Sequence, residues 1–313
     1  MPRNPPDPAQ VIPVIDLVGS FSPSLDERMK VAREANIACR DIGFFYVRNH
    51  GVPDDAIRAA RVVARQFFDL PDERKMQLVC GHGFGYDPPG KQALEPGTPP
   101  DLKDSFLMVA PPQKRADDVP WPDELPAFRW KLEAYQAHLQ TLGQHLMRCI
   151  ALSLDLPEDY FDEACEAPNC AIPVLHYPPR PPGALSNQIG AGAHTDWGAI
   201  TMLHQDEIGG LEVLNADGEW IEATPIEGTF VINLGDLIRR WTNDRYRSTT
   251  HRVVHNAADR PRFSMAAFFS PRDDYPVRCL PTCREEGEAP HYPACSVDEH
   301  FQEMMRRSYE ITV

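Results

Sequence analysis

The sequence predicts a mixed α and β protein in which helices flank a β-rich segment. The first observation is the stretch from residue 171 to 271, where short apolar and β-branched runs recur between Pro, Gly and Asn-Asp. Several short strands at such spacing are typical of an all-β sandwich or barrel. The second is a set of apolar residues at helical spacing between positions 128 and 150, which predicts one long amphipathic helix that packs on the sheet.

The N-terminal third alternates between strand and helix patterns. Ser24 is placed to cap the first helix, with Asp26 and Glu27 in its first turn. A Gly- and Pro-rich stretch predicts a long loop, of the kind that often forms a lid or a binding surface. The expected elements are a strand over residues 12–17, a helix over 25–39, a strand over 43–47, a helix over 54–68 and a loop over 81–100.

The β-rich segment is followed by one more helical pattern, over residues 297–309. We divide the chain into a helix and strand region (1–120), a linking long helix (121–170), a β core (171–272) and a C-terminal segment with a helix (273–313). The strands expected in the core cover residues 174–175, 199–203, 211–214, 230–234, 251–254 and 263–269.

Composition limits the class of protein. A chain of 313 residues can bury a substantial core, and its net charge of −15 argues against a nucleic-acid surface, which needs a basic stripe. No run approaches the roughly 18 continuous apolar residues of a membrane span, and the first residues lack the apolar core of a signal peptide. The eight scattered cysteines contain no Cys-x-x-Cys pair, which indicates reduced thiols. We expect a cytoplasmic protein that binds neither nucleic acid nor membranes; its oligomeric state is not predicted.

The motif His194-Thr195-Asp196 is the most informative part of the chain. If the backbone is extended there, side chains two positions apart lie on one face, so the imidazole and the carboxylate can reach a single metal ion. Taken alone the pair is weak evidence, because a His in an apolar strand is more often an ordinary core residue.

A third ligand has to come from a distant strand. His251 is the best candidate, because its separation from Asp196 leaves room for several short strands to fold back. The competitors are His204, His255 and His176, and His255 would lie about 13 Å from His251 along one strand. Two His and one carboxylate on one face of an octahedron are typical of non-haem Fe(II) sites, because three positions stay open.

A second polar pair lies on the strand expected over residues 263–269. Arg262 and Ser264 are two positions apart and share a strand face within an apolar run. Arg binds carboxylates through a bidentate fork, and a buried Arg without a partner is costly. We expect this pair to bind an anion; the alternative is a structural ion pair with one of the many acidic residues.

Together these motifs resemble the isopenicillin N synthase-like branch of the Fe(II)/2-oxoglutarate-dependent oxygenases. They occur in family order over most of residues 12–271, and as a set they are highly specific. The matching stretches are residues 12–16, 43–52, 67–71 with Lys75, 177–179, 194–196, 209–211, 233–236, 242–243, 251–253 and 262–264.

The resemblance implies a distorted double-stranded β-helix core, of the jelly-roll or cupin-like kind, flanked by helices. Arg262 and Ser264 would bind the distal carboxylate of 2-oxoglutarate, with Tyr177 in the same pocket. With O2 as second co-substrate, such enzymes hydroxylate, desaturate or cyclise a small organic molecule while 2-oxoglutarate is decarboxylated to succinate. The Fe(II) ligands would be His194, Asp196 and His251.

Two other functions stay open. An oxidase of the same branch that does not use 2-oxoglutarate would carry the same Arg-x-Ser pair, for the carboxylate of its own substrate. A non-catalytic β-helix protein would hold a structural metal or a ligand. The complete set of ligands and the acid-binding pair argue against this last function.

Three further residues receive expectations. Arg239 falls where some relatives of the family contact substrate, so it either selects an anionic substrate or is a solvated surface residue. Asn233 and Asp236 are expected to be architectural, with Asp236 in a turn.

Overall fold

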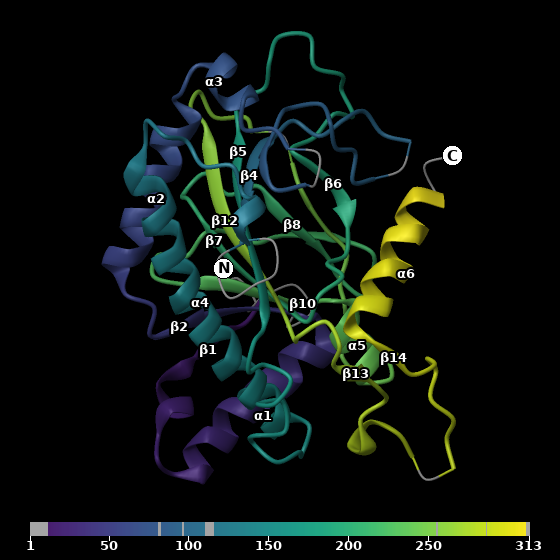
Figure 1. Ribbon diagram of the computed structural model, residues 1–313. Helices are drawn as coiled ribbons and strands as arrows, with labels where there is room; N and C mark the ends of the chain where they lie inside the picture. The colour runs from purple at the N-terminus through teal and green to yellow at the C-terminus, as the bar shows by residue number, and fades with distance from the viewer. Residues whose placement is uncertain are drawn as a thin grey trace, which may run out of the picture.

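Two β-sheets that face each other form the centre of the molecule, and helices pack on the outer side of the larger sheet (Figure 1). The structure is a computed structural model that describes residues 12–80, 83–95, 97–109, 116–254, 256–285 and 287–310. The arrangement confirms the predicted mixed α and β class with a jelly-roll core.

The larger sheet combines strands of the β core with strands of the first 120 residues. In spatial order it contains β1 (Val14–Asp16), β2 (Phe44–Arg48), β10 (Phe230–Leu234), β7 (Ile200–Gln205), β12 (Arg262–Ser270), β5 (Asn169–Tyr177), β4 (Asp104–Met108) and β3 (Gly85–Asp87). Among the described strands of this sheet, β1 and β2 alone pair in parallel. The N-terminal region therefore extends the core sheet at both of its edges.

The smaller sheet carries two of the predicted metal ligands. All its pairings are antiparallel, and β6 forms one edge. In spatial order its strands are β6 (Ala191–His194), β11 (His251–Val253), β8 (Leu211–Leu214) and β9 (Trp220–Glu222). A separate ribbon of β13 (Pro276–Val277) and β14 (Cys295–Ser296) lies nearer the C-terminus.

The longest helix, α4, lies on the outer face of the larger sheet with α1 and α2 packed against it (Figure 1). On the other side of the molecule, α6 contacts the loop after β6, where His300 Nε2 lies 2.8 Å from the carbonyl oxygen of Trp197. The helices are α1 (Leu25–Asp41), α2 (Asp54–Phe68), α3 (Asp72–Met76), α4 (Pro126–Ser153), α5 (Asp236–Trp241) and α6 (Val297–Glu310), with short 3-10 turns at Leu17–Phe21, Ala116–Asp118 and Pro281–Cys283.

Side chains of the larger sheet are divided between two hydrophobic cores, because successive residues of a strand point to opposite faces. On β10, Ile232 packs in the core shared with the helices, whereas Val231 belongs to the core between the sheets. Val213 and Val253 of the smaller sheet complete this inner core. Polar residues on the inner face therefore stand in a space from which most water is excluded.

Most long elements lie where the sequence predicts them. The helix expected over residues 54–68 is α2, and the strands over 211–214 and 230–234 are β8 and β10. The long helix is α4, and the C-terminal helix is α6. The other core strands differ from their expected bounds by a few residues, except that β5 is much longer than the two residues expected within it.

Three expectations for the N-terminal region need correction. The strand over residues 12–17 shrinks to β1, because Leu17 begins a 3-10 helix capped by the carboxylate of Asp16. Ser24 occupies the N-cap of α1, but its side chain makes no capping hydrogen bond. The loop over residues 81–100 contains β3, which pairs with β4; residues 81, 82 and 96 lie outside the described part of the chain.

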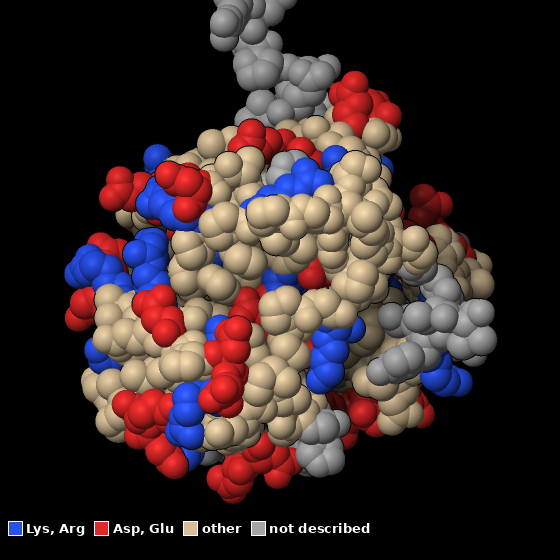
Figure 2. Space-filling model, turned by 90° about the horizontal axis from the view of Figure 1, so that it is seen from above, with Lys and Arg blue, Asp and Glu red and all other residues tan. Residues whose placement is uncertain are grey.

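Two observations bear on large partners. Within the described residues, none of the helices is both long enough and apolar enough to cross a membrane. On the face seen in Figure 2, Lys and Arg side chains alternate with Asp and Glu and form no continuous basic surface. That face therefore lacks the electrostatic pattern that attracts a polyanion.

We expect Gly143→Ala to destabilise the protein. Gly143 lies within α4 against Phe269 of β12, and an added Cβ would stand 2.4 Å from Cδ2 of that ring. Alanine improves helix propensity by about 1 kcal/mol, but overpacking a core costs about 1–3 kcal/mol, so we expect a net loss of about 1 kcal/mol. Urea unfolding measures it, with Thr141→Ala on the exposed side of α4 as control. A gain in stability at position 143 would contradict this packing.

Candidate metal centre

His194, Asp196 and His251 converge at one end of the space between the sheets. His194 ends β6 and His251 begins β11, and the strand register places the two residues opposite each other. Each imidazole Nε2 lies 3.8 Å from Oδ1 of Asp196. One ligand atom from each of the three residues lies within 4.8 Å of the other two. The fold thus brings together the three residues that the sequence singled out.

Asp196 reaches this position by another route than the one expected. Strand β6 ends at His194, so Asp196 lies in the following loop and not on the same strand. Its backbone carbonyl accepts a hydrogen bond from the amide of Asp236, at 2.8 Å. Gly235 lets the two segments approach this closely, because a Cβ there would stand 2.2 Å from the carbonyl oxygen of Gly198. Contact with the β10–α5 junction, and not strand alternation, therefore orients the carboxylate.

Both imidazoles are held with Nε2 toward the carboxylate. Nδ1 of His194 lies 2.7 Å from the carbonyl oxygen of Gly192, and Nδ1 of His251 lies 3.1 Å from that of Thr249. A carbonyl oxygen can only accept a hydrogen bond, so Nδ1 of each ring must be the donor. In this tautomer of the neutral imidazole, Nε2 keeps its lone pair. Two nitrogen lone pairs and one carboxylate oxygen therefore face a common point.

The other oxygen of Asp196 is fixed by the larger sheet. Its Oδ2 accepts hydrogen bonds from Thr201 Oγ1 on β7, at 2.5 Å, and from Asn233 Nδ2 on β10, at 2.7 Å. Asn233 therefore contacts a predicted metal ligand directly, a role beyond the architectural one expected for it. A buried polar residue inside an apolar strand needs a partner, and this was the signal available in the sequence.

Asp236 keeps an architectural position, but it begins helix α5 and does not form a simple turn. Its carboxylate accepts a hydrogen bond from Thr195 Oγ1 at 3.0 Å. Together with its amide bond to Asp196, this contact holds the loop after β6 from both sides.

The electrostatics favour the protonation states that a cation requires. Burial, followed by the nearby His251, lowers the pKa of His194 to about 4, and Lys103 acts in the same direction. Burial tends to raise the pKa of Asp196, but the two imidazoles and the donors on Asn233 and Thr201 outweigh it and keep the pKa below its usual value. At neutral pH the site thus offers a neutral imidazole at His194 beside a carboxylate.

Two of the competing histidines, His176 and His204, do not join this group. His176 lies on β5, where Nδ1 is 2.6 Å from Oδ1 of Asp104 and the ring stacks on Phe68 of α2. His204 on β7 makes an edge contact with Phe230. His255 lies outside the described residues.

The donor set fits Fe(II) in an open site. Two imidazole nitrogens and one carboxylate oxygen on one side of an ion are the ligands of non-haem iron oxygenases, and they leave coordination positions for exogenous molecules. The side chain of His194 is 23% exposed, whereas that of Asp196 is 8% exposed, so the approach lies on the His194 side.

Arg262 and Ser264 lie on the inner face of β12, as predicted. The Arg262 residue is 1% exposed, and its guanidinium lies 4.6 Å from the centre of the Tyr177 ring. Its hydrogen bonds go to the carbonyl of Gly209, to Ser264 Oγ at 3.2 Å and to Gln205 Oε1 at 3.4 Å. The register pairs Arg262 with Tyr177, so the three predicted co-substrate residues share one surface.

These acceptors are all neutral. Among the described residues, no carboxylate lies within ion-pair distance of the Arg262 guanidinium, so the structural ion pair considered from the sequence is not formed there. A buried cation without a counter-ion is costly, and an incoming carboxylate would remove that cost. The surroundings of Arg262 therefore favour anion binding.

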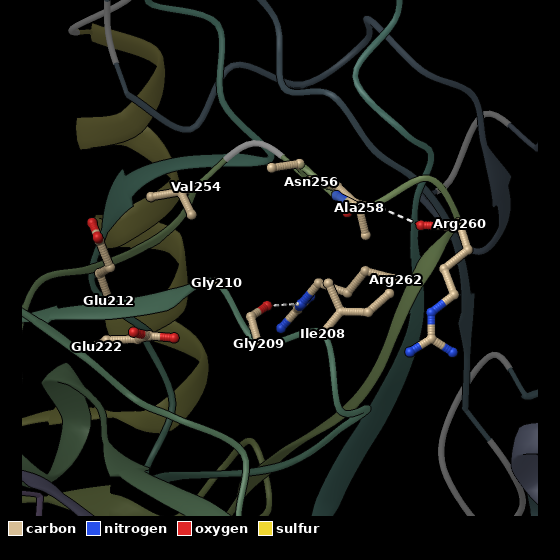
Figure 3. A pocket seen from close by; sticks show the side chains of 11 residues that line it. Ile208, Gly209, Gly210, Glu212, Glu222, Val254, Asn256, Ala258, Arg260 and Arg262 are labelled. Atoms are coloured by element: carbon tan, nitrogen blue, oxygen red, sulfur yellow. Dashed lines mark hydrogen bonds between the residues drawn. The ribbon is translucent and has the colours of Figure 1, made fainter.

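A cavity of about 460 Å³ reaches Arg262 from another direction (Figure 3). Its lining includes Gly209, Glu212 and Val254. Glu212 follows Leu211 and precedes Val213, which both belong to the inner core, so it points to the outer side of the smaller sheet. This cavity is therefore not the space between the imidazoles and Arg262.

Arg239 lies on α5 with its side chain 48% exposed, and Nε forms an ion pair of 2.6 Å with Asp244. Asp244 also accepts hydrogen bonds from His291 and Tyr292. Of the two expectations for Arg239, this position fits that of a solvated surface residue. Substrate selection by Arg239 stays a prediction.

Comparison with known proteins agrees with the geometry. The model of the 2OG-Fe(II) oxygenase superfamily matches residues 168–271, and that of the non-haem dioxygenase in morphine synthesis N-terminal matches residues 12–127. The chain is 33% identical to the 2-oxoglutarate-Fe(II) type oxidoreductase hxnY of Emericella nidulans, covering 95% of this chain and 90% of that protein. It is 35% identical to homoarginine-6-hydroxylase 2-ODD-233 of Oryza sativa subsp. japonica, covering 93% and 95%.

A solved structure extends the agreement to three dimensions. A full-length Neurospora crassa protein, solved in complex with alpha-KG and thymine, superposes with a TM-score of 0.88 at 28% identity, covering 97% of this chain and 98% of that one. The chain belongs to the 2OG-Fe(II) oxygenase superfamily. It is a 2-oxoglutarate-dependent dioxygenase, whose cofactor is Fe(II) and whose co-substrates are 2-oxoglutarate and O2.

We expect Asn233→Ala and Thr201→Val to weaken metal binding while the fold is kept. Each substitution removes one hydrogen bond to Oδ2 of Asp196, and loss of such a partner typically costs about 10- to 100-fold in metal affinity. Anaerobic titration with Fe(II) measures the Kd. Asn36→Ala is the control, because that amide bonds Ser153 and Tyr246. Equal Kd values for control and test variants would remove Asn233 and Thr201 from the metal site.

Proposed function

We propose that His194, Asp196 and His251 hold the Fe(II) of this dioxygenase. The observation that carries the proposal is the convergence of two Nε2 atoms and one Oδ1 atom within 4.8 Å. It is supported by the backbone bonds that fix both imidazole rings and by the two donors that fix the carboxylate. When bound, Fe(II) supplies the redox chemistry that couples decarboxylation of 2-oxoglutarate to oxidation of a substrate.

Arg262 and Ser264 bind the distal carboxylate of 2-oxoglutarate, with the Tyr177 ring against the guanidinium. The burial of Arg262 and its lack of a carboxylate partner among the described residues support this role. Nη1 and Nη2 reach only weak neutral acceptors, at 3.2 and 3.4 Å, and an anion would bind them more strongly. The apolar surroundings of the inner core exclude water, which protects a reactive oxidation from side reactions.

The substrate is a small organic molecule, and we propose hydroxylation as the outcome. The support comes from relatives: one is named for hydroxylation of homoarginine, and the Neurospora crassa protein was solved with thymine. Both are compact polar molecules, so a substrate of that size and polarity is the first to test. The face in Figure 2 supports the absence of a nucleic-acid partner.

The structure, which describes all eight cysteine positions, joins none of them in a disulfide bond. This supports a reducing compartment such as the cytoplasm as the site of action.

The runner-up function is an oxidase that does not need 2-oxoglutarate. The family comparisons favour dependence on 2-oxoglutarate, since the Neurospora crassa protein was solved with alpha-KG. Consumption of O2 without added 2-oxoglutarate, accompanied by substrate oxidation, is the result that would favour the oxidase.

We expect the wild-type protein to release succinate from 2-oxoglutarate with Fe(II), O2 and a suitable substrate, and His194→Ala and Asp196→Ala to lose this activity. Removing one of three ligands leaves too few donors to hold the ion. The His194 variant should unfold within a few degrees of wild type, because His194 is partly exposed. Succinate assay and thermal unfolding are the two measurements.

His204→Ala is the matched control for this experiment. It removes a histidine from β7 whose ring contacts Phe230 and which is not part of the proposed metal site. Activity in the His194 variant equal to that of the control would sink the assignment of the ligands. No absorption change on anaerobic addition of 2-oxoglutarate to the Fe(II) protein would argue against binding of the co-substrate at the metal.

We expect Arg262→Met to raise the KM for 2-oxoglutarate and leave kcat less affected. Methionine keeps apolar packing against Tyr177 but removes a charge-assisted contact worth about 1.5–3 kcal/mol, which corresponds to a change of about 10- to 150-fold. The KM of Arg262→Lys should lie between those of the wild type and the methionine variant, since lysine keeps the charge but cannot form the bidentate contact. An unaltered KM in the methionine variant would remove Arg262 from the co-substrate pocket.

A further inference from the structure

A buried ion pair outside the proposed site lies close to β6. Asp101 and Lys103 stand just before β4, and the residues are 3% and 7% exposed. Lys103 Nζ lies 2.5 Å from Oδ2 of Asp101. Buried charges are expensive to keep in a protein, and a pair of them beside a reaction centre calls for a physical reason.

The pair is connected to a proposed iron ligand through two hydrogen bonds. The amide of Gly192 on β6 donates to the free oxygen of Asp101, Oδ1, at 2.9 Å. The carbonyl of the same Gly192 accepts the Nδ1 proton of His194 at 2.7 Å. Asp101 therefore holds the amide of Gly192, and the carbonyl of the same residue, in the next peptide unit, sets the orientation of the His194 ring.

This arrangement replaces a neighbouring strand. Strand β6 is the edge of the smaller sheet, so no described strand of this sheet pairs with its outer side. Strand β11, in contrast, has a paired strand on each side. Carboxylates take over this role, because the amide of Gly192 donates to Asp101 and that of Ala193 donates to Glu95 Oε2, at 3.3 Å. The two segments also touch directly: a Cβ on Gly192 would stand 2.6 Å from the amide nitrogen of Glu95.

The segment that carries these carboxylates is itself held in place. The amide of Asp101 bonds the carbonyl of Gln92, and the amide of Leu102 bonds the carbonyl of Ile189, each at 2.8 Å. Lys103 supplies the counter-charge that makes a buried carboxylate tolerable at this position. The segment from residue 92 to 103 therefore packs against β6 and connects it to the start of β4.

We propose that Asp101 is a positioning residue for the iron ligand His194, acting through the backbone of Gly192, whose amide bonds Asp101 and whose carbonyl bonds His194, and that Lys103 holds Asp101 in the required orientation. The inference rests on the assignment of His194 as an iron ligand. Since ring orientation decides where Nε2 points, loss of the Asp101 bond should weaken and distort the metal site without removing any ligand. Asp101 touches neither the ligand atoms nor a substrate in this role.

The test compares two double variants that both remove the ion pair. Asp101→Asn with Lys103→Met keeps a neutral acceptor for the Gly192 amide. Asp101→Leu with Lys103→Met has similar volume but no acceptor. We expect Kd for Co(II) and Fe(II) within about threefold of wild type in the first, and about tenfold weaker in the second, the lower end of the range for outer-shell groups. The visible ligand-field bands of bound Co(II) should shift only in the second.

Lys75→Met is the matched control, because Lys75 is a buried lysine paired with Asp72 at 3.0 Å on the helical side of the larger sheet. It should lower thermal stability without moving Kd or the Co(II) bands. Thermal unfolding of the metal-free proteins accompanies every titration. If the leucine variant does not fold, Asp101→Ser with Lys103→Met takes its place, since the shorter side chain does not reach Gly192.

The proposal is overturned if a folded double variant without the acceptor, with Leu or Ser at position 101, has the same Kd and the same Co(II) bands as the wild-type protein. Equal weakening in both double variants, or in Lys75→Met, overturns it as well, because general loosening would then explain the result. A wild-type protein that binds neither metal, with His194→Ala unchanged from it, overturns the metal site itself and the positioning role with it.

Discussion

The carboxylate of Asp196 is the interaction on which the metal centre depends, because it joins the two sheets. One oxygen is held by Thr201 and Asn233 of the larger sheet, and the other faces His194 and His251 of the smaller sheet. A buried carboxylate is stable only when both oxygens have partners. The protein satisfies one oxygen with hydrogen bonds, and a cation bound between the imidazoles would satisfy the other.

Arg262 presents the opposite case on the same inner face. It is a buried cation whose partners among the described residues are neutral oxygens, so a carboxylate ligand would complete its surroundings. The space between the sheets thus combines an anionic centre suited to a metal with a cationic centre suited to an acid. A keto acid that bridges the two charges fits both requirements, which explains why this fold suits 2-oxoglutarate.

Elements were predictable where the apolar pattern is clear. Helix α2 and strands β8 and β10 have the bounds that the apolar pattern indicates. The elements β3, β4 and α5 were missed, since their sequences carry no clear alternation or helical periodicity and they form regular structure against neighbours far away in the chain. The same reason explains the loop position of Asp196: contacts with the β10–α5 junction decide it, and the local sequence does not.

The sequence by itself determined the chemistry of the site: two imidazoles, a carboxylate, and an Arg-x-Ser pair in a chain with a β-rich core. Spacing alone left several histidines open as the third ligand, and the polar Asn233 within an apolar strand indicated a need for a partner without identifying Asp196 as that partner. Tertiary structure decided these points, because hydrogen-bond partners and ring orientations depend on strand register between segments that are remote in sequence. The sequence specifies the residue types, whereas the packing of one sheet on the other sets the directions in which the ligand atoms point.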